Sequence, residues 1–170
     1  MDLPEAGRHE QREALPLSDA ATYVLDEARM VLPGIQALFG FQLIAVFNSV
    51  FSERLSPGEQ RLHLLAIALV AVAVALVMSP AAYHRQTGPR EITETFIQMS
   101  TRLLLWSMLP LAAGICLDFY LAARIILNTS AAPWFAAGLF ATYIGCWFVL
   151  PRIKTHVRRI VETRSATHTE

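Results

Sequence analysis

The chain has 170 residues, of which 54% are hydrophobic and 16% are charged, and its mean hydropathy is +0.41. Because charged residues supply about a quarter of an average soluble domain, this composition excludes an ordinary water-soluble fold. The fourteen basic and fourteen acidic residues cancel, so net charge gives no reason to expect a nucleic-acid partner. We expect an all-α integral membrane protein instead.

The N-terminal part consists of a polar tail, an amphipathic segment and the first predicted membrane span. Residues 1–17 are polar and lack the apolar core of a signal peptide, so we predict a disordered cytoplasmic tail. Residues 20–31, which Ser18 or Asp19 can cap, mix apolar and charged side chains, which is typical of an interfacial amphipathic helix. Leu32–Phe51, with the sequence LPGIQALFGFQLIAVFNSVF, carries no formal charge and would rise about 30 Å as a helix, enough to cross a bilayer. Pro33 favours a bend near its start.

Three further apolar stretches predict three further spans, at about residues 62–79, 103–127 and 131–150. Pro57 and Gly58 predict the turn between the first two spans. The third and fourth spans are flanked by amphipathic or basic stretches, which we interpret as cytoplasmic helical extensions. We therefore predict a single four-helix transmembrane bundle over residues 18–160, followed by a frayed cytoplasmic tail at 161–170.

Small residues recur at helical spacing in two of the spans. Ala68, Ala71, Ala75 and Ser79 follow one face of the second span, and Ala137, Ala141 and Gly145 follow one face of the fourth. Such stripes let helices approach closely in a membrane. They favour a non-enzymatic helical bundle that associates with itself or with a membrane protein partner.

The distribution of Arg and Lys predicts the orientation. If both termini and the loop between the second and third spans share one side, that side holds 11 basic residues and the other side holds 3. Short cytoplasmic loops retain Arg and Lys. We therefore expect both termini in the cytoplasm. The basic segment 152–164 could also bind anionic lipid.

Asp118 is the strongest candidate functional residue, because an ionisable group inside a span costs about 2.5–3.5 kcal/mol on insertion scales. It follows Pro110 and Gly114 at four-residue spacing, so it should project from the small-residue face of the third span. One interpretation is a cation or proton site. The other is a group in the outer headgroup layer, close to Arg61 or Arg124.

Five other polar residues are candidates for an ion pathway. Gln36 and Gln42 lie inside the first span and could line a polar cavity or join helices by hydrogen bonds. Glu27 and Arg29 precede that span and could select ions or anchor it among headgroups. His84 could relay protons, contact a lipid phosphate or simply be solvated at the interface.

The sequence contains no recognisable catalytic motif. It has no nucleophile–base pair, phosphate-binding loop or metal-ligand cluster, and Cys116 and Cys146 lie in apolar stretches where a thiol usually serves packing. We expect no enzymatic activity, no cofactor and no metal.

The segments LDEARMVLPGIQALFGFQL and SPAAYHR resemble an uncharacterised bacterial family of small four-span membrane proteins, over about residues 20–152. The resemblance implies four spans and a bacterial inner membrane. Some members of that family are labelled sodium:proton antiporters, which implies an alternative activity, an oligomeric cation or proton transport protein. The family supplies no catalytic residues to carry over.

Overall fold

The computed structural model describes residues 16–87, 94–127 and 130–152, and the parts it describes are helical. Four of the helices are long and apolar enough to cross a membrane, which confirms the predicted all-α transmembrane architecture. The elements are α1 (Leu17–Val46), α2 (Ser49–Arg54), α3 (Pro57–Thr87), α4 (Glu94–Leu127), α5 (Ala132–Ile144) and a π-helical turn, η1 (Gly145–Val149).

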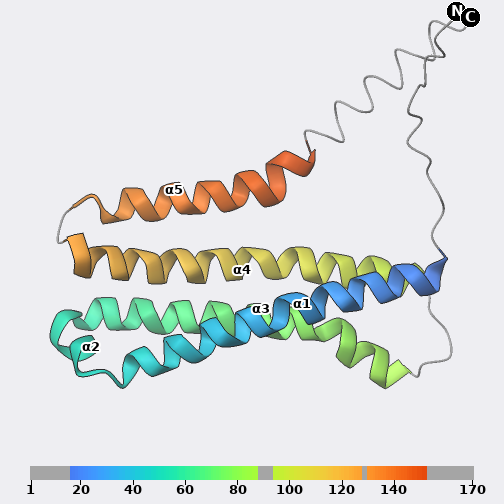
Figure 1. The fold of residues 1–170 in the computed structure, drawn as a ribbon, viewed down its shortest axis with the longest axis horizontal. Helices are drawn as coiled ribbons and strands as arrows, with labels where there is room; N and C mark the ends of the chain where they lie inside the picture. Colours follow the sequence, from blue (N-terminus) through green and yellow to red (C-terminus); the bar gives the residue numbers. More distant parts are fainter. Residues whose placement is uncertain (1–15, 88–93, 128–129, 153–170) are drawn as a thin grey trace, which may run out of the picture.

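The antiparallel pair α3 and α4 forms the centre of the molecule (Figure 1). Helix α1 crosses α3, and α5 packs along the other side of α4. The starts of α1 and α4 and the ends of α3 and α5 lie at one end of the molecule, while α2 lies at the other. This alternation is the one expected for four successive membrane crossings.

The first helix differs at its end from the predicted span. Helix α1 is continuous from the interfacial segment through Pro33, and it ends at Val46 rather than at Phe51. Asn48 then accepts a hydrogen bond from the backbone N–H of Val50, at 3.0 Å, and so caps the short helix α2. Phe51 therefore belongs to α2, which folds back toward α3.

The other helices extend beyond the predicted spans. Pro57 is the first residue of α3 rather than part of a turn, and Ser56 and Glu59 form a capping box at its start. Helix α4 already begins at Glu94, nine residues before the predicted third span. The predictions for residues 1–15 and 153–170, which cover most of the N-terminal tail, most of the basic segment and the C-terminal tail, concern residues outside the described ranges.

The small-residue stripes point away from the centre of the molecule. The face of α3 that packs inside the molecule consists of His63, Ala66, Val70, Ala73 and Val77. Ala68, Ala71 and Ala75, by contrast, are exposed, as are Ala137 and Ala141 of α5. Among the described residues, the expected close packing on these stripes is therefore not made. Within this part of the chain, both stripes face outward, toward lipid or another chain.

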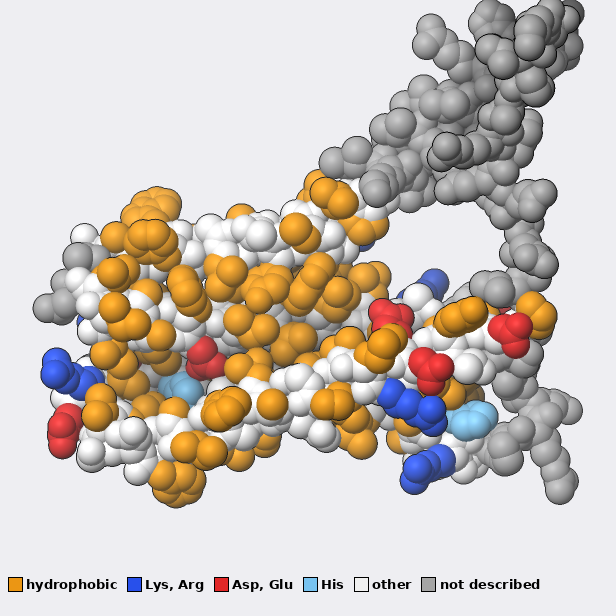
Figure 2. All heavy atoms as spheres, viewed as in Figure 1, with side chains coloured by type: hydrophobic (Ala, Val, Ile, Leu, Met, Phe, Trp, Pro, Cys, Tyr) orange, Lys and Arg blue, Asp and Glu red, His pale blue; other side chains and the backbone are white. Residues whose placement is uncertain are grey.

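Hydrophobic side chains cover the middle of the molecule, and charged ones on the face shown gather toward its two ends (Figure 2). Phe41, Ile126 and Trp134 are among the exposed apolar residues of the described helices. Such a large apolar surface suits a hydrocarbon environment. Figure 2 also shows one acidic and one histidine side chain within the apolar region, which draws attention to the polar residues between the helices.

Candidate functional site

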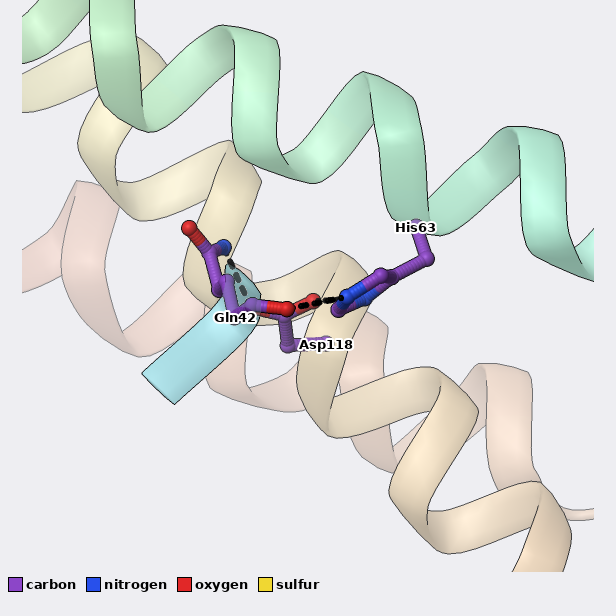
Figure 3. A network of polar contacts seen from close by, with 3 residues as sticks. All are labelled: Gln42, His63 and Asp118. Atoms are coloured by element: carbon purple, nitrogen blue, oxygen red, sulfur yellow. Dashed lines mark hydrogen bonds and ion pairs between the residues drawn. The ribbon is translucent and has the colours of Figure 1, made fainter. Parts of the chain in front are cut away.

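Three helices bring Gln42, His63 and Asp118 together (Figure 3). His63 Nδ1 lies 3.0 Å from Asp118 Oδ1, and His63 Nε2 lies 3.0 Å from the backbone oxygen of Gln42. The side-chain nitrogen of Gln42 donates to Asp118 Oδ2 at 2.5 Å. We call these three residues the polar triad. It links α1, α3 and α4 at a level where apolar side chains surround it.

Close contact between α3 and α4 positions Asp118 against His63. Gly114 lies one turn before Asp118, and a Cβ atom added there would lie 2.8 Å from Val70 Cγ2 and 3.1 Å from the backbone oxygen of Ala66. A side chain at this position would therefore push the two helices apart. The absence of one lets the Asp118 carboxylate reach the imidazole of His63.

The hydrogen bonds of the triad determine how many protons it holds. The backbone oxygen of Gln42 can only accept, so His63 Nε2 must carry a proton. The short contact between His63 Nδ1 and Asp118 Oδ1 also requires one proton, held by either atom. Histidine and aspartate are then together neutral. Loss of the shared proton would leave a negative charge and two lone pairs facing each other.

Gln42 donates a hydrogen bond to the carboxylate of Asp118, but its own side-chain oxygen accepts none from the described residues. The residue is only 3% exposed, and its side-chain nitrogen points toward Asp118. Its side-chain oxygen Oε1 is buried and has no hydrogen-bond partner among the described residues. A buried acceptor without a partner costs about 1–3 kcal/mol. This cost favours a group that can donate to Gln42 Oε1.

A cavity of about 290 Å³ adjoins the triad. Gln42, His63 and Asp118 form its polar part, and apolar side chains line the rest. Phe51 of α2 contacts the imidazole, with ring centroids 5.2 Å apart, so the turn back through α2 covers His63. The Asp118 side chain stays 22% exposed, whereas the side chain of His63 is 8% exposed. The carboxylate is therefore the accessible part of the pair.

A smaller charged pocket of about 160 Å³ lies next to this cavity, and the two share Leu55 and Ile125 as lining residues. Arg54, Glu59 and Arg124 line the charged pocket, and Arg124 forms an ion pair with Glu59 at 2.9 Å. Arg124 therefore pairs with Glu59. One interpretation of the sequence had instead placed Arg124 close to Asp118. The carboxylate of Asp118 pairs with His63 instead.

Of the six candidate residues, the structure brings together Gln42 and Asp118. Gln36 is exposed on the outer face of α1, and it does not line a described polar cavity. Arg29 is exposed and pairs with Asp26 at 3.3 Å. Glu27 is also exposed, and it lies at a second, largely apolar cavity of about 390 Å³.

His84, the sixth candidate, lies at the far end of α3 from the triad and packs against the ring of Phe96, with centroids 5.8 Å apart. His63, which completes the triad, was not among the residues predicted from the sequence. It lies at the start of an apolar stretch that is otherwise rich in Leu, Ile, Val and Ala. One signal in the sequence could have identified it. His63 lies three residues before Ala66 and seven before Val70, so the three residues share one helix face.

No curated protein and no solved structure matches the chain. The model of one protein family matches residues 19–151, which include all three residues of the triad. The match covers most of the chain and agrees with the predicted resemblance to an uncharacterised family. The chain therefore belongs to the family of unknown function DUF6328.

Proposed function

We propose that this chain forms an oligomeric cation or proton transport protein in which His63 and Asp118 hold the exchangeable proton. The observation that carries this proposal is the single proton required between His63 Nδ1 and Asp118 Oδ1, at 3.0 Å, beside a cavity. An ionisable pair inside a membrane span is costly and commonly marks an ion or proton path. Here the cost is reduced by the backbone and amide contacts that Gln42 supplies.

Exchange of the proton follows from the chemistry of the pair. The proton keeps the site neutral, and its loss leaves one negative charge in a mostly apolar setting. Such a charge is strongly unfavourable until a proton or another cation replaces it. The site therefore favours alternation between two positively charged ligands, which is the chemical requirement of a proton-coupled transporter.

Two cavities flank an apolar layer in the centre of the molecule. The triad cavity lies toward the α2 end, where Phe51 lines it, and the other cavity lies toward the opposite end, where Glu27 and Trp147 line it. Ile35 of α1 packs with Val70 and Val77 of α3 in this layer, and Ile35 and Val77 also line the second cavity. In the proposed cycle, this apolar layer must separate for the triad to exchange ligands with the second cavity.

Assembly is part of the proposal, because four spans are few for a single-copy transporter. The exposed small-residue faces of α3 and α5 supply surfaces on which copies could pack. The same observation supports the second candidate function, a non-enzymatic bundle that associates with itself or with a membrane partner. In that case the triad would serve only to join α1, α3 and α4.

The proposed location is a bacterial inner membrane, with both termini cytoplasmic, from the distribution of Arg and Lys. The triad would then lie toward the extracytoplasmic face, and the basic C-terminal segment would meet anionic lipid. Labelling of an Ser52→Cys variant by a membrane-impermeant thiol reagent from outside intact cells tests this orientation. Labelling only after cell disruption would contradict it.

Flux through proteoliposomes separates the two functions. The full chain is reconstituted into liposomes that enclose a pH-sensitive dye, and gradients of protons, Na⁺, K⁺ and a small organic cation are imposed in turn. We expect the wild type to change the internal pH and Asp118→Asn to be inactive. Asp26→Asn is the matched control, because Asp26 is an exposed carboxylate paired with Arg29. This control should keep wild-type flux.

Equal behaviour of the wild type and Asp118→Asn under every gradient would remove the transport proposal. Chemical crosslinking and native mass spectrometry in mild detergent test the assembly directly. A strictly monomeric protein with no co-purifying partner would contradict both candidate functions.

A further inference from the structure

The lining of the triad cavity is unusual for an inorganic ion site. Its polar residues are the three members of the triad, and the remaining eight are apolar. Two phenylalanines, Phe41 and Phe51, contribute to these walls. The cavity therefore combines one carboxylate with an apolar and partly aromatic surface.

This combination suits an organic cation better than a metal ion. A bare metal cation needs several oxygen ligands, about six for Na⁺-sized or larger ions, and only Asp118 and Gln42 bring side-chain oxygens to the lining. An organic cation needs one counter-charge, apolar contact area and aromatic faces. Each of these is present in the cavity.

The cavity also opens onto the apolar outer surface, from which a hydrophobic cation would approach. Phe41 is 71% exposed and Ile125 is 41% exposed, and both belong to the apolar outer surface as well as to the cavity lining. A hydrophobic cation concentrates at the bilayer interface, next to this surface. On the other side of Leu55 and Ile125, Arg54 and Arg124 present two positive charges against the one carboxylate of Glu59. Hydrated metal cations approaching from there meet a net positive pocket.

We propose that the triad cavity binds a small, hydrophobic, monovalent organic cation in exchange for the proton shared by His63 and Asp118. The inference rests on the proposed function and names its second ligand. Binding releases the shared proton to water, and the cation takes over as the counter-charge of the carboxylate. The charge of the site is the same before and after exchange. The other charged groups nearby, Arg54 and the Glu59–Arg124 pair, line the neighbouring pocket and do not contact Asp118.

The test uses benzyltrimethylammonium, which has a permanent charge and no proton of its own. The full chain in detergent micelles is titrated calorimetrically in buffers of different ionisation enthalpy, so that proton release is counted. We expect about one proton released per cation bound, and an affinity that rises about tenfold per pH unit while the site is protonated. Neopentylbenzene, the neutral molecule of the same shape, should bind at least about tenfold more weakly.

Three variants keep the result interpretable. Asp118→Asn should lose both the binding and the proton release, and Asp26→Asn should keep them. Ala122→Phe fills the cavity from a position that is exposed and does not belong to the triad. It should abolish cation binding but leave the ¹⁵N NMR signals of the two His63 ring nitrogens unchanged. Those signals show that the hydrogen bonds of the triad are still formed.

Three outcomes would overturn the inference. Equal binding of neopentylbenzene would show an apolar groove without a role for charge. Proton release by NaCl at the same concentration would indicate a metal cation as the second ligand. Binding without proton release would show that the cation does not compete at the triad. Proton flux that persists in proteoliposomes in any of these cases would leave the proposed function standing without this substrate class.

Discussion

His63 and Asp118 are separated by 55 residues in the sequence, and their side chains meet at 3.0 Å between α3 and α4. Because His63 Nε2 faces a backbone oxygen, this contact requires a shared proton. The pair joins the two central helices and presents a carboxylate to a cavity. Both the packing of the helices and the proposed proton exchange depend on it.

Replacement of Asp118 by Asn should preserve the fold. The Asn amide nitrogen can donate to His63 Nδ1, while its oxygen accepts from Gln42, so both contacts survive without an exchangeable proton. We expect the free energy of unfolding to stay within about 1 kcal/mol of wild type, measured by titration into a denaturing detergent. Asp118→Ala should cost about 1–3 kcal/mol for each partner left unpaired. Equal losses in the two variants would contradict this account.

The two glutamines of α1, one buried and one exposed, allow the same substitution to be compared at two positions. Gln42→Leu removes the donor to Asp118 Oδ2 from a buried position, so it should lower the free energy of unfolding by about 1–3 kcal/mol. Gln36→Leu is the same substitution at an exposed position, and it should alter the free energy of unfolding by no more than about 0.5 kcal/mol. Thermal unfolding followed by circular dichroism compares them. A larger effect at Gln36 would mean that α1 is packed differently.

Gly114 should not tolerate a side chain. Gly114→Ala places a methyl group 2.8 Å from Val70 Cγ2, so it should destabilise the α3–α4 contact by about 1–3 kcal/mol. Gly138→Ala is the control, because no atom lies within 4 Å of a Cβ at that position of α5. It should be neutral or stabilising by up to about 1 kcal/mol through helix propensity. The comparison is read from unfolding midpoints, and a neutral Gly114→Ala would argue against close packing there.

Glu59 should stabilise the start of α3. Its carboxylate accepts from the backbone and hydroxyl of Ser56, at 2.9 and 2.8 Å, and pairs with Arg124 of α4. Glu59→Ala should therefore lower the free energy of unfolding by about 1–2 kcal/mol, mostly through the lost cap. Glu53→Ala, at an exposed site in α2, should be silent in the same assay. An unaffected Glu59→Ala protein would show that the capping box contributes little.

The sequence predicted the parts of this architecture that depend on local patterns. Apolar stretches of sufficient length located the four spans. Four-residue spacing correctly placed Asp118 on the same face of α4 as Gly114, toward α3. Local spacing sufficed here because a helix fixes which residues share a face.

The partners of Asp118 could not be predicted in the same way. They come from α1 and α3, and their choice depends on how the helices pack rather than on any local spacing. His63 was hidden in an apolar stretch, and the first helix ends at Val46 because Asn48 caps α2, a competition between helix continuation and capping. The small-residue stripes were recognised, but their direction was not, since a stripe alone does not say which neighbour covers it.

The protonation of His63 tests the central claim most directly. The full chain, labelled with ¹⁵N-histidine and placed in lipid bicelles, is followed by NMR between about pH 5 and pH 9, and a His63→Gln sample assigns the signals. We predict that Nε2 of His63 carries a proton in both proteins, and that the Nδ1 signal of the wild type differs from that of Asp118→Asn, because an amide donor replaces the shared proton. A His63 spectrum that is identical in the two proteins across this range would contradict a proton shared between His63 and Asp118.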